Sequence, residues 1–139
     1  MIAVDSSVLI DLIGGGGGAE AAERTLRSAL AEGPVGACEV VVAEVVAGLG
    51  SGSVVMELLD DIGIAFSPLQ LRSAVRAGEM QRRYKERLRS GHALAAGART
   101  VPDFLIGAHA MMQCDALITR DAGFYRDYFK GLKLIVPKA

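Results

Sequence analysis

Four acidic residues occur where strands are expected to end or helices to begin, in a sequence that is otherwise rich in apolar residues. Asp5 follows the apolar stretch IAV, and Asp121 stands two residues beyond ALIT. Asp103 opens the segment PDFLIGAHAMM, and Glu44 is the only charge within VVVAEVVAG. Unpaired carboxylates that meet at one place repel each other, so such a group usually binds a cation. Because the ligands are hard oxygens and no His/Cys set accompanies them, the favoured ion is Mg²⁺ or Mn²⁺ rather than zinc.

Each of these acids also has an ordinary structural explanation. Asp5 and Asp121 can cap helices, and Asp103 suits the positive end of a helix dipole. Glu44 can mark the solvent side of a helix. The metal-site hypothesis therefore depends on whether the fold brings all four acids to one edge.

The elements that would position these acids alternate along the chain. Strands are predicted at 2–4, 35–38, 64–66, 116–119 and 132–136. Helices are predicted from a cap at Ser6 or Ser7 to Leu12, over 19–32, near 54–62, and over about 69–89, 102–112 and 124–129. The Val-rich segment 39–49 fits strand or helix, because periodicity alone does not separate them. The glycines at 14–18 indicate a flexible turn, since the context of a phosphate-binding loop is missing.

This alternation predicts an α/β fold whose mostly parallel sheet is covered by helices on both faces. The length of 139 residues, without a long linker, predicts a single domain over 1–139. In open sheets of this kind, sites gather outside the carboxyl ends of the strands. Asp5 and Asp121 are expected at that edge, and Asp103 begins the helix that leads into the strand at 116–119.

Composition excludes several classes of protein. Hydrophobic residues make up 51% of the chain, so it is not disordered. No apolar stretch approaches the roughly 20 residues of a membrane span, and the acidic N-terminal segment is unlike a signal peptide. Cys38 and Cys114 lie among apolar neighbours without motif spacing, which indicates buried free thiols in a reducing compartment. A cytoplasmic protein without membrane contact is expected.

The net charge of −1 hides a strong asymmetry between the two halves of the chain. Residues 1–71 hold ten acidic and two basic residues, whereas 72–139 hold six acidic and thirteen basic ones. The densest basic run is RAGEMQRRYKERLRSG, which contains Arg82, Arg83 and Arg87. Such polarity points to a polyanion or a charged partner, and the alternative is a solvated helix face.

Three stretches together carry a resemblance to a known family. MIAVDSSVLIDLI, PDFLIGAHA and LITRDAGFYRDYF resemble the PIN-domain ribonucleases, specifically the VapC-type toxins of prokaryotic toxin–antitoxin pairs. The resemblance spans almost the whole chain in the right order, although the glycine run departs from the expected pattern. It implies a PIN-like fold with a five-stranded sheet in the order 3-2-1-4-5, flanked by helices. It also implies a homodimer and a cognate antitoxin.

The resemblance assigns roles to the residues already singled out. The family's acidic quartet falls on Asp5, Glu44, Asp103 and Asp121. Asp5 and Asp103 would be the principal metal ligands, and Glu44 and Asp121 would complete the sphere and help orient the nucleophile. The family's hydroxyls beside the acids would be those of Ser6 or Ser7 and Thr119.

The implied activity is a metal-dependent endoribonuclease that leaves 5′-phosphate and 3′-hydroxyl ends. Mg²⁺ (or Mn²⁺) stabilises the anionic transition state of phosphodiester cleavage and activates water. The helix that carries Arg82, Arg83 and Arg87 would then contact the RNA backbone.

Two rival functions remain open. The first is a non-catalytic PIN-like module that binds RNA or a protein. The second is a Mg²⁺-dependent phosphotransfer domain of another α/β family, which would need a further acid close behind a nucleophilic aspartate. The stretch DSSVL after the first strand supplies no such acid.

The sequence also suggests how an antitoxin could inhibit the nuclease. It could lay an apolar helix on the toxin and insert an arginine among the four acids, because a guanidinium bonds carboxylates bidentately and stays charged. The apolar patch is expected from Val8, Leu9, Leu12, Met56 and Leu59, with burial in the core as the alternative.

Overall fold

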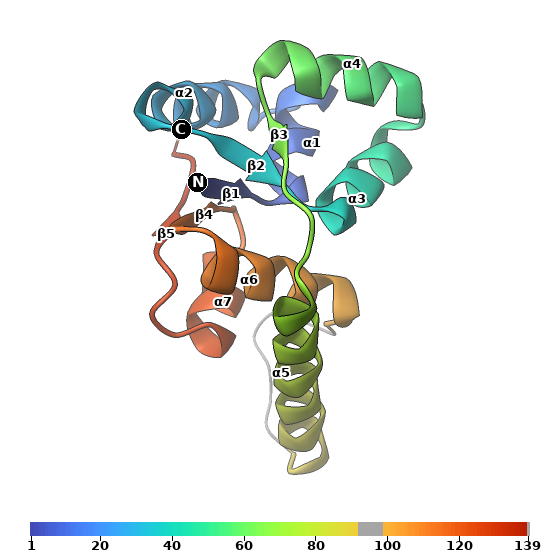
Figure 1. The fold of residues 1–139 in the computed structure, drawn as a ribbon, viewed down its shortest axis with the longest axis vertical. Coiled ribbons are helices and arrows are strands. Elements are labelled where there is room, and N and C mark those ends of the chain that lie inside the picture. Colours follow the sequence, from blue (N-terminus) through green and yellow to red (C-terminus); the bar gives the residue numbers. More distant parts are fainter. Residues whose placement is uncertain (92–98, 139) are drawn as a thin grey trace.

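The computed structural model describes residues 1–91 and 99–138, which form alternating strands and helices (Figure 1). The strands are β1 (Ile2–Val4), β2 (Val35–Ala37), β3 (Ala65–Phe66), β4 (Ala116–Ile118) and β5 (Leu134–Ile135). The helices are α1 (Ser6–Gly14), α2 (Ala19–Glu32), α3 (Glu39–Leu49), α4 (Gly52–Ile62), α5 (Leu71–Arg89), α6 (Val101–Gln113) and α7 (Ala122–Tyr128).

The five strands form one sheet in which every pairing is parallel. Their order is β3-β2-β1-β4-β5, which confirms the predicted topology and fold class. All residues of β2 and β4 are buried, as expected for strands of a parallel sheet covered on both faces. Figure 1 places α2 and α4 on one side of the sheet and α6 and α7 on the other.

The Val-rich segment 39–49 is a helix, α3. Val41 and Val45 are buried one turn apart, while Glu39 and Ala43 face solvent. This spacing follows the 3.6-residue period, so the tertiary packing of one side selects the helix despite the valine content.

The glycine run joins two helices at the predicted break. Helix α1 continues to Gly14, two residues beyond the expected end, and Gly15 adopts a left-handed conformation with φ of 71°. A Cβ at Gly18 would lie 2.7 Å from the Oδ2 atom of Asp11, so a side chain there would require the Asp11 carboxylate to move. Glycine therefore allows the closest approach where α2 starts against α1.

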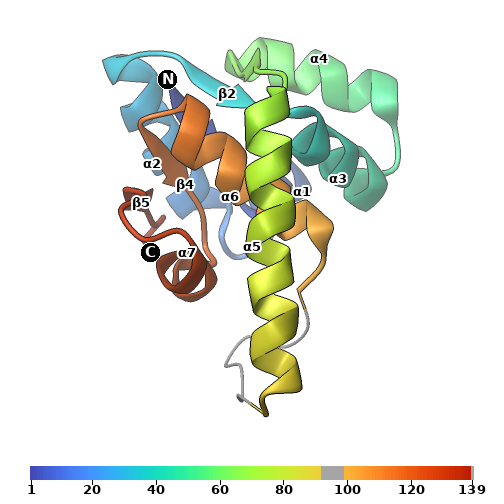
Figure 2. The same ribbon diagram turned by 60° about the horizontal axis from the view of Figure 1, so that its bottom comes forward.

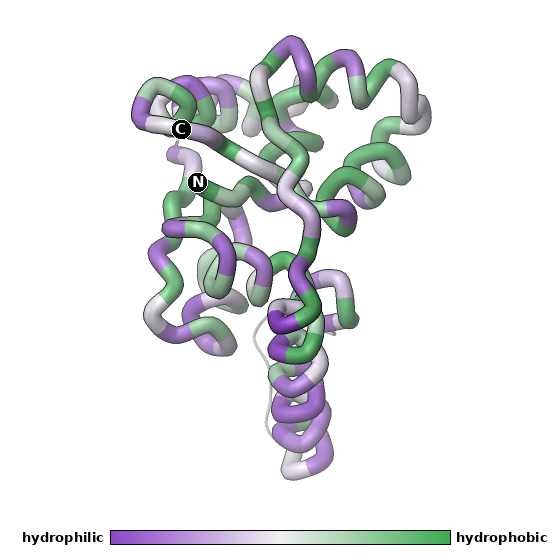
Figure 3. The backbone as a smooth tube through the Cα atoms, in the orientation of Figure 1, coloured by the Kyte–Doolittle hydropathy of each residue, from purple (hydrophilic) through white to green (hydrophobic). Residues whose placement is uncertain are grey.

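Helix α5 extends away from the sheet and packs along α6 (Figure 2). Its buried residues Ser73, Ala77, Met80 and Tyr84 recur every three or four positions. Hydrophilic residues predominate over the rest of α5, in contrast to the segments around the sheet (Figure 3). The ends of α5 and α6 are thereby held beside α7, where Tyr84, Phe104 and Tyr128 form an aromatic cluster with ring centroids 5.5–5.7 Å apart.

Several sequence predictions need correction. Val8, Leu9 and Leu59 are 0%, 0% and 5% exposed, so they belong to the core and not to a surface patch. Helix α6 begins at Val101, which makes Pro102 its second residue.

Both cysteines are free thiols, and Cys38 is buried whereas Cys114 is half-buried. Among the described residues, none of the helices is long and apolar enough to cross a bilayer.

Candidate functional site

Asp5 lies at the carboxyl end of β1, beside the end of β4. The parallel register pairs Val4 with Ile118, so the next residues of both strands leave the sheet together. The backbone N–H of Asp5 donates to the carbonyl of Ile118 at 2.9 Å. The Thr119 hydroxyl donates to Oδ2 of Asp5 at 2.7 Å, and both residues are buried. Two strands that are distant in sequence thus fix this carboxylate.

The serines of α1 bind carboxylates and do not cap the helix. The N-cap position is Asp5, whose extended backbone precedes the first helical turn. The Ser6 hydroxyl donates to Oε1 of Glu44 at 2.9 Å, and the Ser7 hydroxyl lies 3.3 Å from Oδ2 of Asp5. Ser6 therefore links Glu44, on α3, to the start of α1, although 38 residues separate them.

Asp121 joins the same network from the loop after β4. Its backbone N–H donates to the Thr119 hydroxyl oxygen at 2.9 Å, and this hydroxyl in turn donates to Asp5. Asp121 occupies the N-cap position of α7, yet its side chain makes no capping hydrogen bond. The same is true of Asp5 at α1. The capping explanation for these two acids is therefore wrong.

Asp103 does have a structural role at the start of α6. Its Oδ2 atom accepts a hydrogen bond from the backbone N–H of Thr100 at 3.1 Å. Its Oδ1 atom lies 4.0 Å from Nη1 of Arg99. One carboxylate oxygen of Asp103 thus accepts a hydrogen bond at the start of α6, and the other lies near the guanidinium of Arg99.

Arg99 is a residue of this site that the sequence reasoning missed. Its Nη1 atom donates to Oδ2 of Asp121, and its guanidinium carbon lies 4.5 Å from the centre of the Phe124 ring. Its side chain is only 12% exposed. One sequence feature could have drawn attention to it, because Arg99 is the only lysine or arginine between Arg89 and Arg120.

The acids share one electrostatic environment. Burial raises the pKa of Asp5, and hydrogen bonds from Thr119 and Ser7 only partly oppose this. Burial also raises the pKa of Glu44, with a further contribution from the charges of Asp5 and Asp103.

The pKa of Tyr125, on α7, is affected by all four acids. Burial raises the pKa of its hydroxyl well above the usual value, and the charges of Asp5, Asp103, Asp121 and Glu44 each add to the effect. The structure therefore brings the four predicted acids to one end of the sheet.

The donors fit a divalent cation in kind, although the arrangement is not a finished ligand sphere. Within residues 1–91 and 99–138, no three His, Cys, Asp or Glu side chains are close enough to ligate one ion. The donors are nevertheless all carboxylate oxygens, which Mg²⁺ and Mn²⁺ prefer. A cation, the guanidinium of Arg99, already lies against two of them.

The three arginines predicted to bind RNA lie on α5 but do not share one face. Arg82 is exposed and lies 3.3 Å from Glu86. Arg83 approaches the sulfur of Met80 at 3.9 Å, and the guanidinium of Arg87 covers the Tyr128 ring at 5.2 Å. Arg83 and Arg87 are one turn apart and therefore face the same side, whereas Arg82 projects elsewhere. Their contact with RNA stays a prediction.

A family model of the PIN domain matches residues 2–130, nearly the whole chain. The chain belongs to the PIN domain family. No curated protein sequence matches it closely enough to count as a relative.

Solved structures of low sequence identity share the fold of this PIN domain. One match is the structure of VapBC2 from Rickettsia felis bound to a DNA fragment from its promoter. Its TM-score is 0.70 and its sequence identity 17%, over 99% of this chain and 100% of that chain. A toxin-antitoxin complex from Klebsiella pneumoniae matches with a TM-score of 0.65 and 20% identity, over 99% and 98% of the two chains. FitAcB from Neisseria gonorrhoeae gives a TM-score of 0.64 and 22% identity over the same shares.

Proposed function

We propose that this PIN domain is a VapC-type toxin, a metal-dependent endoribonuclease that a cognate antitoxin neutralises in the cytoplasm. The observation that carries the proposal is the network at the ends of β1 and β4. There, Thr119 binds Asp5 and Asp121, and Ser6 binds Glu44. Such a network orients carboxylates that would otherwise repel each other.

The residues of the site would divide the work. Asp5 and Asp103 would be the principal ligands of Mg²⁺ or Mn²⁺, and Glu44 and Asp121 would complete the sphere. When bound, the ion supplies charge stabilisation for the phosphodiester transition state and a more acidic water.

The surrounding hydroxyls would act through the carboxylates. The hydroxyls of Thr119 and Ser7 both donate to Oδ2 of Asp5, so they restrict the orientation of this carboxylate. Glu44, whose pKa burial raises, would accept a proton from the attacking water more readily than an exposed glutamate.

Cleavage of a labelled single-stranded RNA tests the proposed activity. Cleavage is expected with Mg²⁺ or Mn²⁺, and it should stop with EDTA. The products should carry 5′-phosphate and 3′-hydroxyl ends. Glu44→Gln, purified in parallel, controls for a contaminating nuclease and should be inactive. RNA binding without metal-dependent cleavage would favour the non-catalytic PIN-like module instead.

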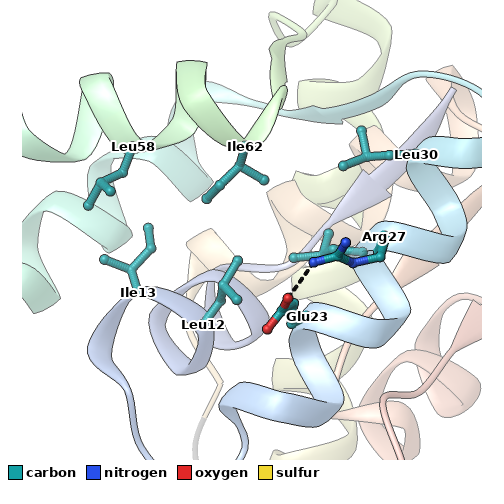
Figure 4. Close-up of a pocket in the computed structure, with 8 residues that line it drawn as sticks. Leu12, Ile13, Glu23, Arg27, Leu30, Leu58 and Ile62 are labelled. Atoms are coloured by element: carbon teal, nitrogen blue, oxygen red, sulfur yellow. Dashed lines mark hydrogen bonds and ion pairs between the residues drawn. The ribbon is translucent and has the colours of Figure 1, made fainter.

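A groove between α1, α2 and α4 is the proposed binding site for a helix of the antitoxin (Figure 4). Its volume is about 450 Å³, and the ion pair between Glu23 and Arg27, with Oε1 and Nη2 2.5 Å apart, forms part of its lining. The apolar side chains that line it are Leu12, Ile13, Leu26, Leu30, Leu58 and Ile62. Of the patch expected from the sequence, only Leu12 lines this groove. An amphipathic helix of the antitoxin would bury its apolar face here.

The groove is tested by binding of the antitoxin to Leu58→Glu. Its affinity should fall by about tenfold or more, because a buried charge would replace an apolar contact. Asp61→Asn, on the same helix but with an exposed side chain that is outside the groove lining, is the control. Equal affinities of both variants would argue for another docking surface.

A homodimer is also proposed, and exposed apolar residues on α5 are candidates for its interface. Leu71 is 80% exposed and Val75 56% exposed, one helical turn apart. Burial of such side chains against a second copy of the chain would be favourable, because it removes apolar surface from water. Light scattering should give a dimer mass for the wild type and a monomer mass for Leu71→Glu combined with Val75→Glu.

A further inference from the structure

Arg99 occupies the place where a cation is expected among the acids. Its Nη1 atom is hydrogen-bonded to Asp121 and lies 4.0 Å from Asp103. These are two of the four carboxylates that the proposed function assigns to the divalent ion. The guanidinium therefore holds oxygens that the ion would need.

Two further contacts fix the rest of the residue. The backbone N–H of Arg99 donates to the Tyr84 hydroxyl at 2.7 Å, which attaches it to α5. The guanidinium stacks over the Phe124 ring of α7, and the side chain is 12% exposed. The positive charge is thus held at the site and cannot drift into solvent with the freedom of a surface arginine.

The guanidinium is incompletely satisfied in this position. Its buried Nε atom has no hydrogen-bond partner among the described residues. A purely structural arginine normally uses its fork of donors more fully, since a buried donor without a partner is destabilising. The attraction of the carboxylates compensates for this cost, which indicates that electrostatic neutralisation holds Arg99 here.

We infer that Arg99 is an internal counter-ion that competes with the divalent metal for Asp121 and Asp103. This inference rests on the proposed function, because it takes the same acids to be the metal ligands. Without metal, Arg99 neutralises part of the cluster and occupies an oxygen of Asp121. Metal binding requires Asp121 to exchange the guanidinium for the ion, so Arg99 lowers the affinity of the site and limits its activity at low metal.

Calorimetric titration with Mn²⁺ tests the competition without any measure of activity. Arg99→Gln removes the charge, and its affinity for Mn²⁺ should rise by about tenfold or more, because a like charge several ångströms away disfavours a dication even where the dielectric is high. Arg120→Gln is the matched control. Arg120 adjoins Asp121 in sequence, but its guanidinium pairs with Asp11 at 2.9 Å. Its Mn²⁺ affinity should stay within about twofold of the wild type, since exposed charges are well screened.

A double-mutant cycle separates competition at Asp121 from a general effect of charge. Asp121→Asn should weaken Mn²⁺ binding, and Arg99→Gln should have a much smaller effect in that background than in the wild type. Thermal unfolding in EDTA provides a second readout. Arg99→Gln should lower the Tm of the metal-free protein, and Mn²⁺ should raise it more in this variant than in the wild type.

Each outcome decides between the hypotheses. Equal or weaker Mn²⁺ binding by Arg99→Gln, in a folded protein, would overturn the counter-ion and leave Arg99 a structural residue. Equal gains in affinity for Arg99→Gln and Arg120→Gln would overturn the specific competition. If neither the wild type nor Arg99→Gln bound Mn²⁺, the proposed metal site itself would fail, and the competition with it.

Discussion

Thr119 and Asp5 form the central contact of the candidate site, with the Thr119 hydroxyl 2.7 Å from Oδ2 of Asp5. The two residues are 114 positions apart in sequence and lie at the ends of adjacent parallel strands. The same hydroxyl accepts the backbone N–H of Asp121. One fully buried oxygen therefore sets the position of one acid through its side chain and of another through its backbone.

Replacement of Thr119 by valine should disrupt this arrangement. The variant keeps the shape of the side chain but leaves Oδ2 of Asp5 with only the longer contact to Ser7, and it leaves the backbone N–H of Asp121 without its partner. The combined loss should be about 1–3 kcal/mol. Urea unfolding should detect the loss of stability, and RNA cleavage should fall with it. Thr119→Ser retains the hydroxyl and should preserve most of both. Equal stability of the two variants would mean that the hydrogen bonds matter little.

Asp5→Asn or Asp103→Asn should abolish RNA cleavage while leaving the fold intact. Each substitution removes a charged ligand from the cluster. For Asp5, burial disfavours the charge and raises the pKa, so the amide should also stabilise the metal-free protein. Cleavage assays and thermal unfolding in EDTA measure the two effects. Asp61→Asn, on the exposed side of α4, controls for the loss of one negative charge. Full activity of Asp5→Asn with saturating metal would contradict the ligand assignment.

Arg82, Arg83 and Arg87 should contribute to RNA binding through counterion release. Their joint replacement by glutamine should weaken binding and reduce the slope of log affinity against log salt by about 0.7 for each phosphate that is no longer neutralised. Filter binding at several salt concentrations measures this slope. Arg24 and Arg27 on α2, replaced together, are the control. An unchanged slope would leave α5 as a solvated helix face. Because Arg83 and Arg87 face one side, their pair should account for most of the effect.

His109 should make the stability of the protein depend on pH. Burial lowers its pKa, and the ring Nε2 lies 2.9 Å from the Ser67 hydroxyl oxygen. The unfolded chain therefore binds the proton more readily than the folded one. The contribution of His109 is complete above the unfolded value of about 6.5 and is lost as pH falls through the lower folded pKa.

Urea unfolding of the wild type and His109→Gln across pH 5 to 7.5, roughly the range in which histidine titrates, measures this contribution. Glutamine can still hydrogen-bond Ser67 but does not titrate, so the difference between the two proteins should grow smaller towards acid. Parallel curves for both proteins would show that another group controls the pH dependence.

An antitoxin arginine should compete with metal for the acidic pocket. A peptide that carries the arginine should inhibit less as Mg²⁺ rises, because both cations need the same carboxylates. Inhibition is measured as RNA cleavage over a matrix of peptide and Mg²⁺ concentrations. The peptide with glutamine in place of its arginine is the control. Inhibition independent of both Mg²⁺ and the arginine would leave steric blockade or dimer disruption as the mechanism.

Much of the architecture follows from local sequence patterns. The apolar segments at 2–4, 35–38 and 116–119 alternate with amphipathic segments. This alternation leads to a parallel sheet, because neighbouring parallel strands are joined by crossover connections that are usually helices. Asp5 and Asp121 are predicted near each other for the same reason, since the carboxyl ends of parallel strands share an edge. The family motifs add the strand order.

Tertiary packing decided the features that local patterns left open. The segment 39–49 is a helix because Val41 and Val45 bury one side against the core, which its composition alone does not specify. Val8 and Leu9 lie in that core because α1 is covered by α2 and α3, whereas Leu12 lines the groove. Ser6 binds Glu44 rather than capping its helix, because α3 brings a carboxylate within 2.9 Å.

The sequence by itself determined which residue types stand at the ends of the strands, because hydrophobic periodicity and chain connectivity act over a few neighbouring residues. It did not determine the counter-charge of the site. Arg99 forms an ion pair with Asp121, although 22 positions and two elements separate them in sequence. The local sequence around either residue does not predict this contact. Only the packing of α6 and α7 against the sheet places the guanidinium beside the acids, because electrostatic partners are chosen by proximity in space and not by order along the chain.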